Sequence, residues 1–378
     1  MTENIFYEYE KITNSQFIEY VQQNQHLHKY FKSRWGEIYP LQYCGILNFD
    51  SSDVYILPKI SSREAERNLD IFIYMLFYSY DISIENEDMA AAKNKKSTIL
   101  EILVQLFVKN LLKELKKGLY KTYITQQDNL TKLRGKYLLN ENVKHNFTRN
   151  KIYCEYDEFS EDNELNRFFL FALQTLLPFV KNKKILKECE LILCDVGTKK
   201  FDIQKLNIGF DRINHRFKQS YELALLLLQK MIPMFTQEKK SFAFLFDMNE
   251  LFENFIGKIY KSLDRTTQTQ RQKNYGSLVL KPDIVTFDMI IDTKYKKIGS
   301  RADLSAADKY QMFAYGTNFK IKNTMLLYPK HLETIFEDLK LGKDDTIVEL
   351  KMRSIDLDFD GGYEEFIIEM KKRVEILG

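Results

Sequence analysis

The sequence predicts a mixed α+β region in the N-terminal part of the chain and an α/β/α domain in its last third. Near the N-terminus, two runs rich in β-branched and aromatic residues, 43–49 and 54–60, flank a short acidic turn, as in a β-hairpin. After residue 240 the apolar periodicity changes in the order helix, three strands, helix, two strands and a final helix. Helices that flank a mixed central sheet satisfy this order.

The remaining elements follow from the same periodicity. Apolar residues at helical spacing predict helices in the N-terminal and middle parts, over 64–83, 95–120, 168–177 and 221–232. Pro178 is expected to end or kink the third of them. In the last third we expect a helix over 247–260, a strand over 324–328, a strand near 346–356 and a helix from residue 363.

The length of the chain bounds the number of domains. With about 150 residues per domain as a soft guide, 378 residues predict two or three domains. A polar interval at 122–129 suggests one boundary, and the polar segment 236–240 suggests another. We therefore expect an N-terminal α+β region, a middle region of strands and helices, and a C-terminal α/β/α domain, over 1–125, 126–235 and 236–378.

Composition excludes several classes of protein. The formal net charge of +3 does not by itself predict nucleic-acid binding, so any basic surface must be local. The four cysteines form no paired Cys-x₂-Cys set, and the five histidines are not placed to complete a zinc site. The longest apolar run, 71–80, is about half the ~20 residues that span a bilayer. With no signal peptide, we expect a cytoplasmic protein with reduced thiols and no membrane segment.

The strongest chemical signal lies at 281–295. Asp283 follows a proline, an apolar run leads to Asp292, and Lys294 comes two positions later. Because side chains alternate across a strand, Asp292 and Lys294 project to the same side, and Asp283 can reach that patch from the neighbouring strand. Carboxylates are hard ligands for Mg²⁺ or Mn²⁺, which lowers the pKa of a bound water, and a lysine can orient that water or offset charge on a phosphate. The arrangement resembles the signature of the PD-(D/E)xK nucleases, which implies a restriction-endonuclease-like α/β/α domain.

An ordinary surface triplet is the alternative, because acid-x-Lys is common in a chain with 29% charged residues. The context of this triplet argues for a site. β-Branched residues at 284, 285, 290 and 291 favour buried strands, and a charged pair at the end of a buried strand is costly unless it is paired or bound to metal.

Two flanking helices carry further candidates. Glu253 lies at the edge of the apolar stripe of the first helix, where it is either a third metal ligand or an ordinary surface acid. The second helix, over 308–316, carries Tyr310 and Gln311. Gln311 could hold a phosphate or a water, and Tyr310 could stack on a sugar or base of DNA; simple packing explains either residue equally well.

Several longer motifs occur in a common order. They are Ile-Leu-Pro-Lys-Ile at 56–60, Leu-Arg-Gly at 133–135, Tyr-Asp-Glu-Phe-Ser-Glu-Asp and Leu-Asn-Arg within 156–167, Asp-Met-Asn-x-Leu-Phe-Glu at 247–253, and Tyr-Gln-Met-Phe-Ala-Tyr-Gly at 310–316. Over about residues 40–330, these motifs resemble those of the McrC family, the nuclease subunits of McrBC modification-dependent restriction systems.

The resemblance implies a division of labour. A hexameric AAA+ GTPase ring of the McrB type translocates DNA; the McrC-like chain docks on the ring, stimulates GTP hydrolysis and cuts double-stranded DNA that carries 5-methylcytosine, as in type IV anti-phage restriction. The chain has no Gly-x₄-Gly-Lys-[Ser/Thr] loop, so it is not expected to bind a nucleotide itself. Two alternatives remain: an activator of the GTPase with a degenerate nuclease fold, and a structure-specific nuclease that acts alone.

Docking on the ring is expected through a loop or hairpin within 40–60 or 130–156. Lys132, Arg134 and Lys136 are the candidate contacts, or they cover a solvated strand face. The acidic segment 155–164 is interpreted as the start of a helix that Ser160 caps, rather than as a metal site. Arg134 and Arg167 are candidates to pair with these acids.

Overall fold

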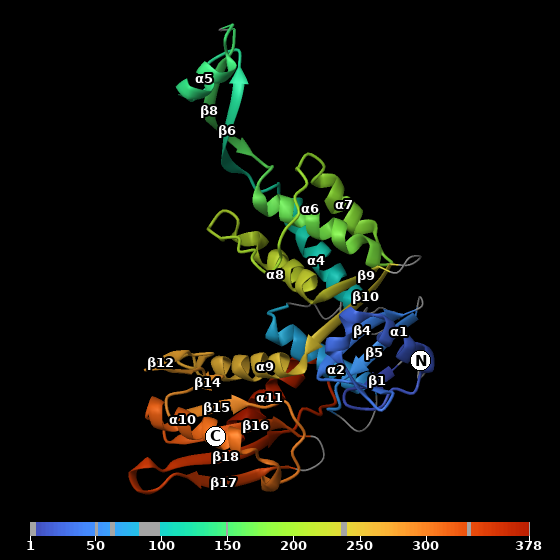
Figure 1. Ribbon diagram of the computed structural model, residues 1–378, viewed down its shortest axis with the longest axis vertical. Coiled ribbons are helices and arrows are strands. Elements are labelled where there is room, and N and C mark those ends of the chain that lie inside the picture. The colour runs from blue at the N-terminus through green and yellow to red at the C-terminus, as the bar shows by residue number, and fades with distance from the viewer. Residues whose placement is uncertain are drawn as a thin grey trace. The chain divides into compact units, whose positions relative to one another are not determined.

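The computed structural model describes residues 5–49, 52–60, 65–82, 99–148, 150–235, 240–330 and 334–377 (Figure 1). By compactness the chain forms two units. One comprises Met1–Glu85 together with Ser241–Gly378, and the other, inserted between them, comprises Asn86–Lys240. The expected division into three consecutive domains stays a prediction; the expected ranges are 1–125, 126–235 and 236–378. The boundary expected at 235/236 lies close to the end of the inserted unit at Lys240.

The first unit contains a sheet built mainly by the N-terminal part of the chain. Its five strands are hydrogen-bonded in the order β1 (Ile5–Tyr7), β5 (Ser52–Leu57), β4 (Tyr43–Phe49), β10 (Lys240–Asp247) and β9 (Met231–Phe235). The expected hairpin is confirmed as β4–β5, although β5 ends at Leu57 and turn residues 50 and 51 lie outside the described part. Strand β10 was not expected; it pairs antiparallel with β4 and leads directly into the next helix.

Short elements surround this sheet. They are α1 (Ser15–Gln23), the hairpin of β2 (Phe31–Arg34) and β3 (Glu37–Pro40), and α2 (Ala65–Ser79), which confirms the helix expected over 64–83. Helix α1 begins after Asn14, whose side chain accepts a hydrogen bond from the Phe17 amide at 3.0 Å.

The C-terminal part of the first unit holds a six-stranded mixed sheet. Its order is β11 (Gln268–Thr269), β14 (Ile284–Val285), β15 (Met289–Thr293), β16 (Asn323–Pro329), β18 (Val348–Ile355) and β17 (Phe336–Leu341). Strands β15, β16 and β18 are parallel, and β14 and β17 run antiparallel to their neighbours. The strands expected at 324–328 and 346–356 are confirmed; β17 was missed.

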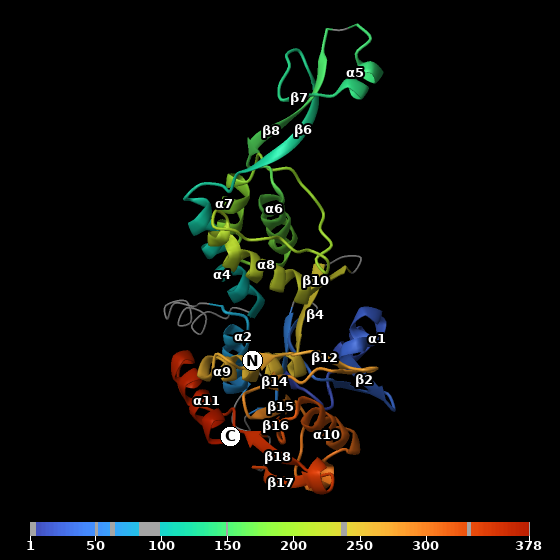
Figure 2. The same ribbon diagram turned by 90° about the vertical axis from the view of Figure 1, so that its left-hand side faces the viewer.

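Helices cover both faces of this sheet (Figure 2). Helix α10 (Ala306–Phe319) lies on one face, and α9 (Met248–Leu263) and α11 (Tyr363–Leu377) lie on the other. Every residue of β15 is buried, which requires cover on both sides. Five short strands, β11 to β15, connect α9 to α10, where three were expected. This region is therefore a three-layer α/β/α arrangement.

The inserted unit is helical, with a projecting hairpin. Its helices are α4 (Ile99–Leu115), α5 (Leu139–His145), α6 (Glu164–Leu176), α7 (Lys184–Ile192) and α8 (Lys218–Lys230). The helices expected over 95–120, 168–177 and 221–232 correspond to α4, α6 and α8, and residues 95–98 lie outside the described part. A short 3₁₀ turn that contains Pro178 follows α6, as expected. No helix of the described residues is long and apolar enough to cross a membrane.

The polar interval 122–129, expected as a boundary, forms a strand. It forms β6 (Thr122–Leu130), which pairs antiparallel along its whole length with β8 (Ile152–Ser160); the short β7 (Lys136–Tyr137) joins on the other edge. The residues of β6 are half-buried or exposed and none is fully buried, so the strand has no continuous apolar face and its sequence resembles a linker. Residues 122–160, which include α5, are called the arm below; it extends away from the helices of its unit (Figure 1).

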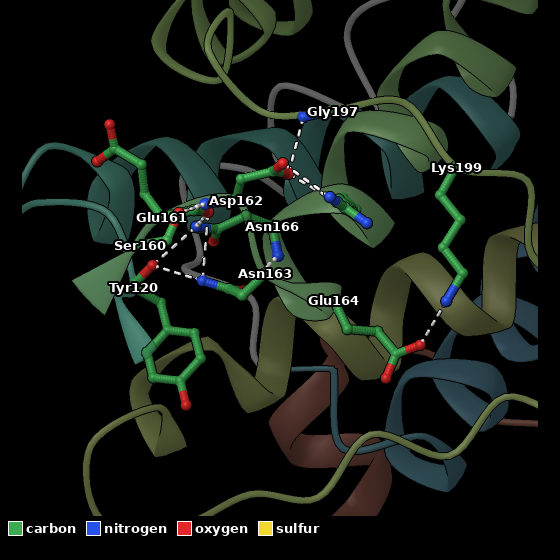
Figure 3. Close-up of polar contacts among 10 residues, drawn as sticks. Tyr120, Ser160, Glu161, Asp162, Asn163, Glu164, Asn166, Gly197 and Lys199 are labelled. Atoms are coloured by element: carbon green, nitrogen blue, oxygen red, sulfur yellow. Dashed lines mark hydrogen bonds and ion pairs between the residues drawn. The ribbon is translucent and has the colours of Figure 1, made fainter. Parts of the chain in front are cut away.

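Buried polar side chains hold the base of the arm (Figure 3). Asn163 caps α6 by accepting a hydrogen bond from the Asn166 amide at 3.1 Å, so the expected cap, Ser160, was wrong; Ser160 accepts from the Asp162 amide instead. The side chain of Asn166 donates to the carbonyls of Tyr120 and Glu161 at 2.8 and 2.7 Å. These carbonyls lie just outside β6 and β8, so one residue of α6 holds both ends of the arm.

The expected pairing of Arg167 with the acidic segment is confirmed. Its guanidinium forms two hydrogen bonds with Asp162, at 2.6 and 2.7 Å. Asp162 also accepts from the Gly197 amide at 2.8 Å (Figure 3). The hydrogen bonds from Arg167 lower the pKa of Asp162, which therefore stays ionised as a structural anion.

Candidate active site

The candidate site forms where β14 and β15 meet. Ile284 pairs with Ile291, which places Asp283 beside the end of β15 where Asp292 lies. Asp283 Oδ2 accepts hydrogen bonds from the backbone amide and the hydroxyl of Thr293 at 2.8 and 2.9 Å. The antiparallel turn thus brings together two acids that are nine residues apart in sequence.

Lys294 follows β15 directly and faces Asp292. Its Nζ lies 2.6 Å from Asp292 Oδ2, and its backbone amide donates to the Leu327 carbonyl at 2.9 Å, which continues the pairing with β16. Asp292 is only 2% exposed. Asp292 and Lys294 therefore lie on the same side of the strand, as the alternation of strand side chains predicts.

Gln311 of α10 connects the charged pair to the rest of the fold. Its Oε1 accepts from Lys294 Nζ at 3.1 Å, and its Nε2 donates to Asp292 Oδ1 at 3.2 Å. The same Nε2 donates to the Tyr315 hydroxyl at 2.9 Å, and that hydroxyl donates to the Lys281 carbonyl at 3.1 Å. Of the two candidates on this helix, Gln311 faces the site. Tyr310 is 74% exposed and makes no hydrogen bond to a described residue of the site.

Glu253 reaches the same patch from α9. Its side chain is partly buried and forms no hydrogen bond or ion pair with any described residue. Burial, together with the charges of Asp283 and Asp292, raises the pKa of Glu253 to about 7. The three predicted acids thus share one region of negative charge.

The electrostatics of the site favour a cation. Burial, together with the nearby Asp283, raises the pKa of Asp292 to about 6, against the opposing effect of Lys294. Burial also raises the pKa of Asp283, and its hydrogen bonds with Thr293 oppose that rise. For Lys294, burial lowers the pKa, but the charges of Asp292 and other nearby acids outweigh it, so the pKa is raised and the side chain stays an ammonium.

The donor set fits a hard divalent cation, provided that the carboxylates rearrange. In the described part of the chain, no group of three or more His, Cys, Asp or Glu side chains is arranged to hold a metal ion. Lys294 contacts one carboxylate oxygen of Asp292, and Thr293 donates to one carboxylate oxygen of Asp283. However, the buried Asp292 Oδ2 has only the close ammonium and no well-directed hydrogen bond, and Glu253 has no partner. Such carboxylate oxygens are the ligands that Mg²⁺ and Mn²⁺ take.

Some residues of the site were not expected from the sequence. Tyr315, four residues after Gln311, lies on the same face of α10, and helical spacing could have indicated it. Glu8 could not have been found in this way. It follows β1, is 3% exposed, and accepts a hydrogen bond at 2.5 Å from the hydroxyl of Tyr295, the residue after Lys294.

The three candidate docking residues lie on the arm and are exposed. The Arg134 guanidinium lies over the Tyr156 ring, 4.0 Å from its centre, and 3.9 Å from Glu158. Lys136 lies 3.8 Å from Glu155, whereas Lys132 forms no ion pair with a described residue. The pairing expected for Arg134 with the acidic segment is therefore present.

Comparisons with known proteins agree with this architecture. Residues 39–329 match the family described as "McrBC 5-methylcytosine restriction system component". A solved half-complex from a tetradecameric assembly of Thermococcus gammatolerans McrB AAA+ hexamers with bound McrC is similar over 99% of both chains, with a TM-score of 0.62 and 20% identity. The cryo-EM structure of the Thermococcus gammatolerans McrBC complex matches 68% of this chain and 86% of its own, with a TM-score of 0.50 and 23% identity. No curated protein sequence matches the chain. The family match covers more than half of the sequence, and the chain therefore belongs to the McrBC restriction system family.

Proposed function

We propose that this chain is the DNA endonuclease subunit of a GTP-dependent, modification-dependent restriction complex. The observation that carries the proposal is the convergence of Asp283, Asp292 and Lys294 at the end of β15, in a chain of the McrBC family. A mixed sheet with helices on both faces supports a restriction-endonuclease-like domain. The proposed reaction is the hydrolysis of a phosphodiester bond in double-stranded, 5-methylcytosine-containing DNA in the cytoplasm.

The residues of the site have distinct roles in this reaction. Asp283, Asp292 and Glu253 would hold Mg²⁺ or Mn²⁺, which when bound lowers the pKa of a water and polarises the phosphate. Lys294 is oriented by Asp292 and Gln311, so its ammonium can position that water or offset charge on the phosphate. Gln311, fixed by Tyr315, keeps the ammonium in place when Asp292 turns toward a cation.

The proposed partner is a hexameric AAA+ GTPase ring. One similar solved structure contains McrB AAA+ hexamers with bound McrC and another is a McrBC complex, and we extend that assembly to this chain. The arm is the proposed docking element, because a narrow hairpin fits a ring pore more readily than a helical bundle does. Its base is held by Asn166 and by the Asp162–Arg167 pair, so the hairpin is anchored to the helices of its unit.

A cleavage assay tests the catalytic proposal. The chain is co-purified with its proposed McrB-type GTPase partner and incubated with GTP, Mg²⁺ and methylated or unmethylated DNA. We expect Asp292→Asn and Lys294→Gln to abolish cleavage while ring binding and GTPase stimulation persist. The matched controls are Asp288→Asn, in the exposed turn between β14 and β15, and the exposed Lys297→Gln; both should cut normally.

Four outcomes contradict the proposal in different ways. Unchanged cleavage by Asp292→Asn moves the active site elsewhere. Loss of GTPase stimulation by that folded variant contradicts the division of labour. Robust cutting in excess EDTA rules out the metal mechanism, for which Mn²⁺ should replace Mg²⁺ and Ca²⁺ should support binding without turnover. A wild-type chain that stimulates the GTPase but cuts no modified DNA favours the non-cleaving activator.

Docking is tested in the full chain. Cutting the chain at residue 230 would remove β10 from its pairing with β4, so a truncated N-terminal piece is not a clean test. We expect Lys132→Ala and Arg134→Ala to weaken GTPase stimulation and to leave the melting temperature nearly unchanged. Full stimulation by Arg134→Ala would show that this residue only stacks on Tyr156.

A further inference from the structure

A basic segment leads into the candidate site. Between Asp264 and Asp283 the chain carries four cations and no acid; they are Arg265, Arg271, Lys273 and Lys281. The formal net charge of the whole chain is only +3. The segment is therefore locally basic in a chain whose charges otherwise nearly balance.

The segment forms a separate β-hairpin that is joined to the site at both ends. Strands β12 (Lys273–Tyr275) and β13 (Leu278–Leu280) pair only with each other in the described sheets. Residues 270–281 are called the wing below. At its start the Gln270 amide donates to the Asp283 carbonyl at 2.8 Å, and at its end the Lys281 carbonyl accepts from the Tyr315 hydroxyl at 3.1 Å. In Figure 1 the wing lies beyond the C-terminal end of α9.

The cations of the segment are not neutralised within the described protein. None of the four forms an ion pair with a described residue. Arg271 and Lys273 alternate onto one face of the wing, where they lie 5.9 and 5.3 Å from the centre of the Phe319 ring. Tyr275, on the same face, contacts that ring edge-on at 5.7 Å. Phe319 ends α10 and so holds the wing in place while it leaves both charges available to an anion.

The tip of the wing, residues 276–279, is uncharged and exposed. It begins with Gly276, in the left-handed region, and its Leu278 and Val279 side chains are 54% and 61% exposed. Uncharged side chains at such a tip do not repel phosphates and can contact sugars or groove walls. The combination of unpaired cations and an uncharged tip fits a polyanion with a regular backbone.

We propose that the wing binds the phosphate backbone of duplex DNA and holds the duplex beside the candidate active site. This inference rests on the proposed nuclease function, and it assigns DNA contacts to Arg271 and Lys273, which have no part in the proposed chemistry. Because the wing is joined to Asp283 and Tyr315 at its base, DNA bound there lies next to the acids and Lys294.

The test measures DNA binding as a function of salt. Binding of a short labelled duplex by the full chain is followed by fluorescence anisotropy between about 50 and 200 mM salt, with Ca²⁺ in place of Mg²⁺. Each lost phosphate contact flattens the plot of log affinity against log salt by about 0.9, so Arg271→Gln/Lys273→Gln should flatten it by about 1.8. At 0.1 M salt this corresponds to an affinity about 60-fold weaker.

Two matched variants separate DNA contact from other effects. Lys371→Gln/Lys372→Gln removes the same charge from α11 and should keep the wild-type slope. Arg271→Lys/Lys273→Arg keeps the charges of the wing and should also keep the slope.

The outcomes distinguish failure of this inference from failure of the proposed function. An unchanged slope in Arg271→Gln/Lys273→Gln, or an equal loss in the α11 control, overturns the wing as the DNA contact while cleavage with the ring still supports the nuclease. Loss of binding in both the neutral and the charge-preserving variants shows that Arg271 and Lys273 only hold the wing on Phe319, which also overturns the inference. The inference is also overturned if the wild-type chain cleaves DNA together with the ring but, in the absence of the ring, shows no salt-dependent DNA binding. A wild-type chain that neither binds nor cleaves DNA overturns the proposed function itself.

Discussion

Replacement of the buried Glu8 by glutamine should change how the stability of the protein depends on pH. Glu8 Oε1 accepts hydrogen bonds from the Tyr295 hydroxyl at 2.5 Å and from the Lys59 amide at 3.0 Å, and the Cys44 thiol lies 4.0 Å from Oε2. Burial raises the pKa of Glu8 from 4.5 to about 7, and the two hydrogen bonds oppose that rise. Glutamine keeps an acceptor of the same shape and removes the charge.

The magnitude follows from linkage between proton binding and folding. A folded-state pKa of about 7 against an unfolded value of 4.5 corresponds to about 3 kcal/mol, at about 1.4 kcal/mol for each pH unit. Because the pKa of this acid is raised by folding, the folded state binds more protons between these two values, and stability falls as the pH rises through them. Most of the effect, about 2.5 kcal/mol, lies between about pH 5 and pH 8. Glu8→Gln should lack this loss and should be more stable than the wild type at about pH 8.

The assay is urea unfolding followed by circular dichroism at about pH 5 and pH 8. The other buried acids titrate in both proteins, so the difference between variant and wild type isolates Glu8. Glu10→Gln is the control, because Glu10 is an exposed neighbour that pairs with Lys59. If Glu8→Gln retains the pH dependence of the wild type, Glu8 does not carry a buried, raised pKa and the argument fails.

Three further variants test the site and the arm. Glu253→Gln should abolish metal-dependent cleavage and yet stabilise the metal-free protein at about pH 8, because it removes one of three crowded acids; lower stability in thermal melts would argue against this crowding. Gly135→Ala should distort the arm, since Gly135 has a φ of +68° and an added Cβ would lie 2.3 Å from the Glu155 carbonyl oxygen; normal GTPase stimulation would contradict that expectation. Asn166→Ala removes two hydrogen bonds at the base of the arm, while Asn163 still donates to the same two carbonyls, and it should cost about 1–3 kcal/mol in urea unfolding; a cost below about 0.5 kcal/mol would mean that the bonds from Asn163 are sufficient.

The candidate site was largely predictable because its residues are close in sequence. Asp283, Asp292 and Lys294 lie within a single hairpin, and strand alternation alone determines which of them share a face. Glu253 and Gln311 were more difficult, since each lies on a separate helix whose rotation depends on packing. Tyr310 and Gln311 are adjacent in sequence, yet only Gln311 faces the acids.

The arm shows where periodicity fails. No residue of strand β6 is fully buried, so no apolar stripe marks it, and the segment resembled a boundary. The cap of α6 was also misplaced by three residues, because Ser160, Asp162 and Asn163 all have capping side chains and only the path of the chain out of β8 decides among them.

The positions of the main helices and the chemical character of one hairpin were determined by the sequence alone, since both depend on neighbours within about one helical turn or one strand pair. Tertiary structure decided which distant segments meet. It brought Glu8 to Tyr295 across 287 residues and β10 to the N-terminal strand β4, and it placed one compact unit as an insertion within the other. Such contacts depend on burial and backbone pairing between distant segments. The sequence of each segment does not indicate which other segment it will contact, so only the folded structure reveals the pairing.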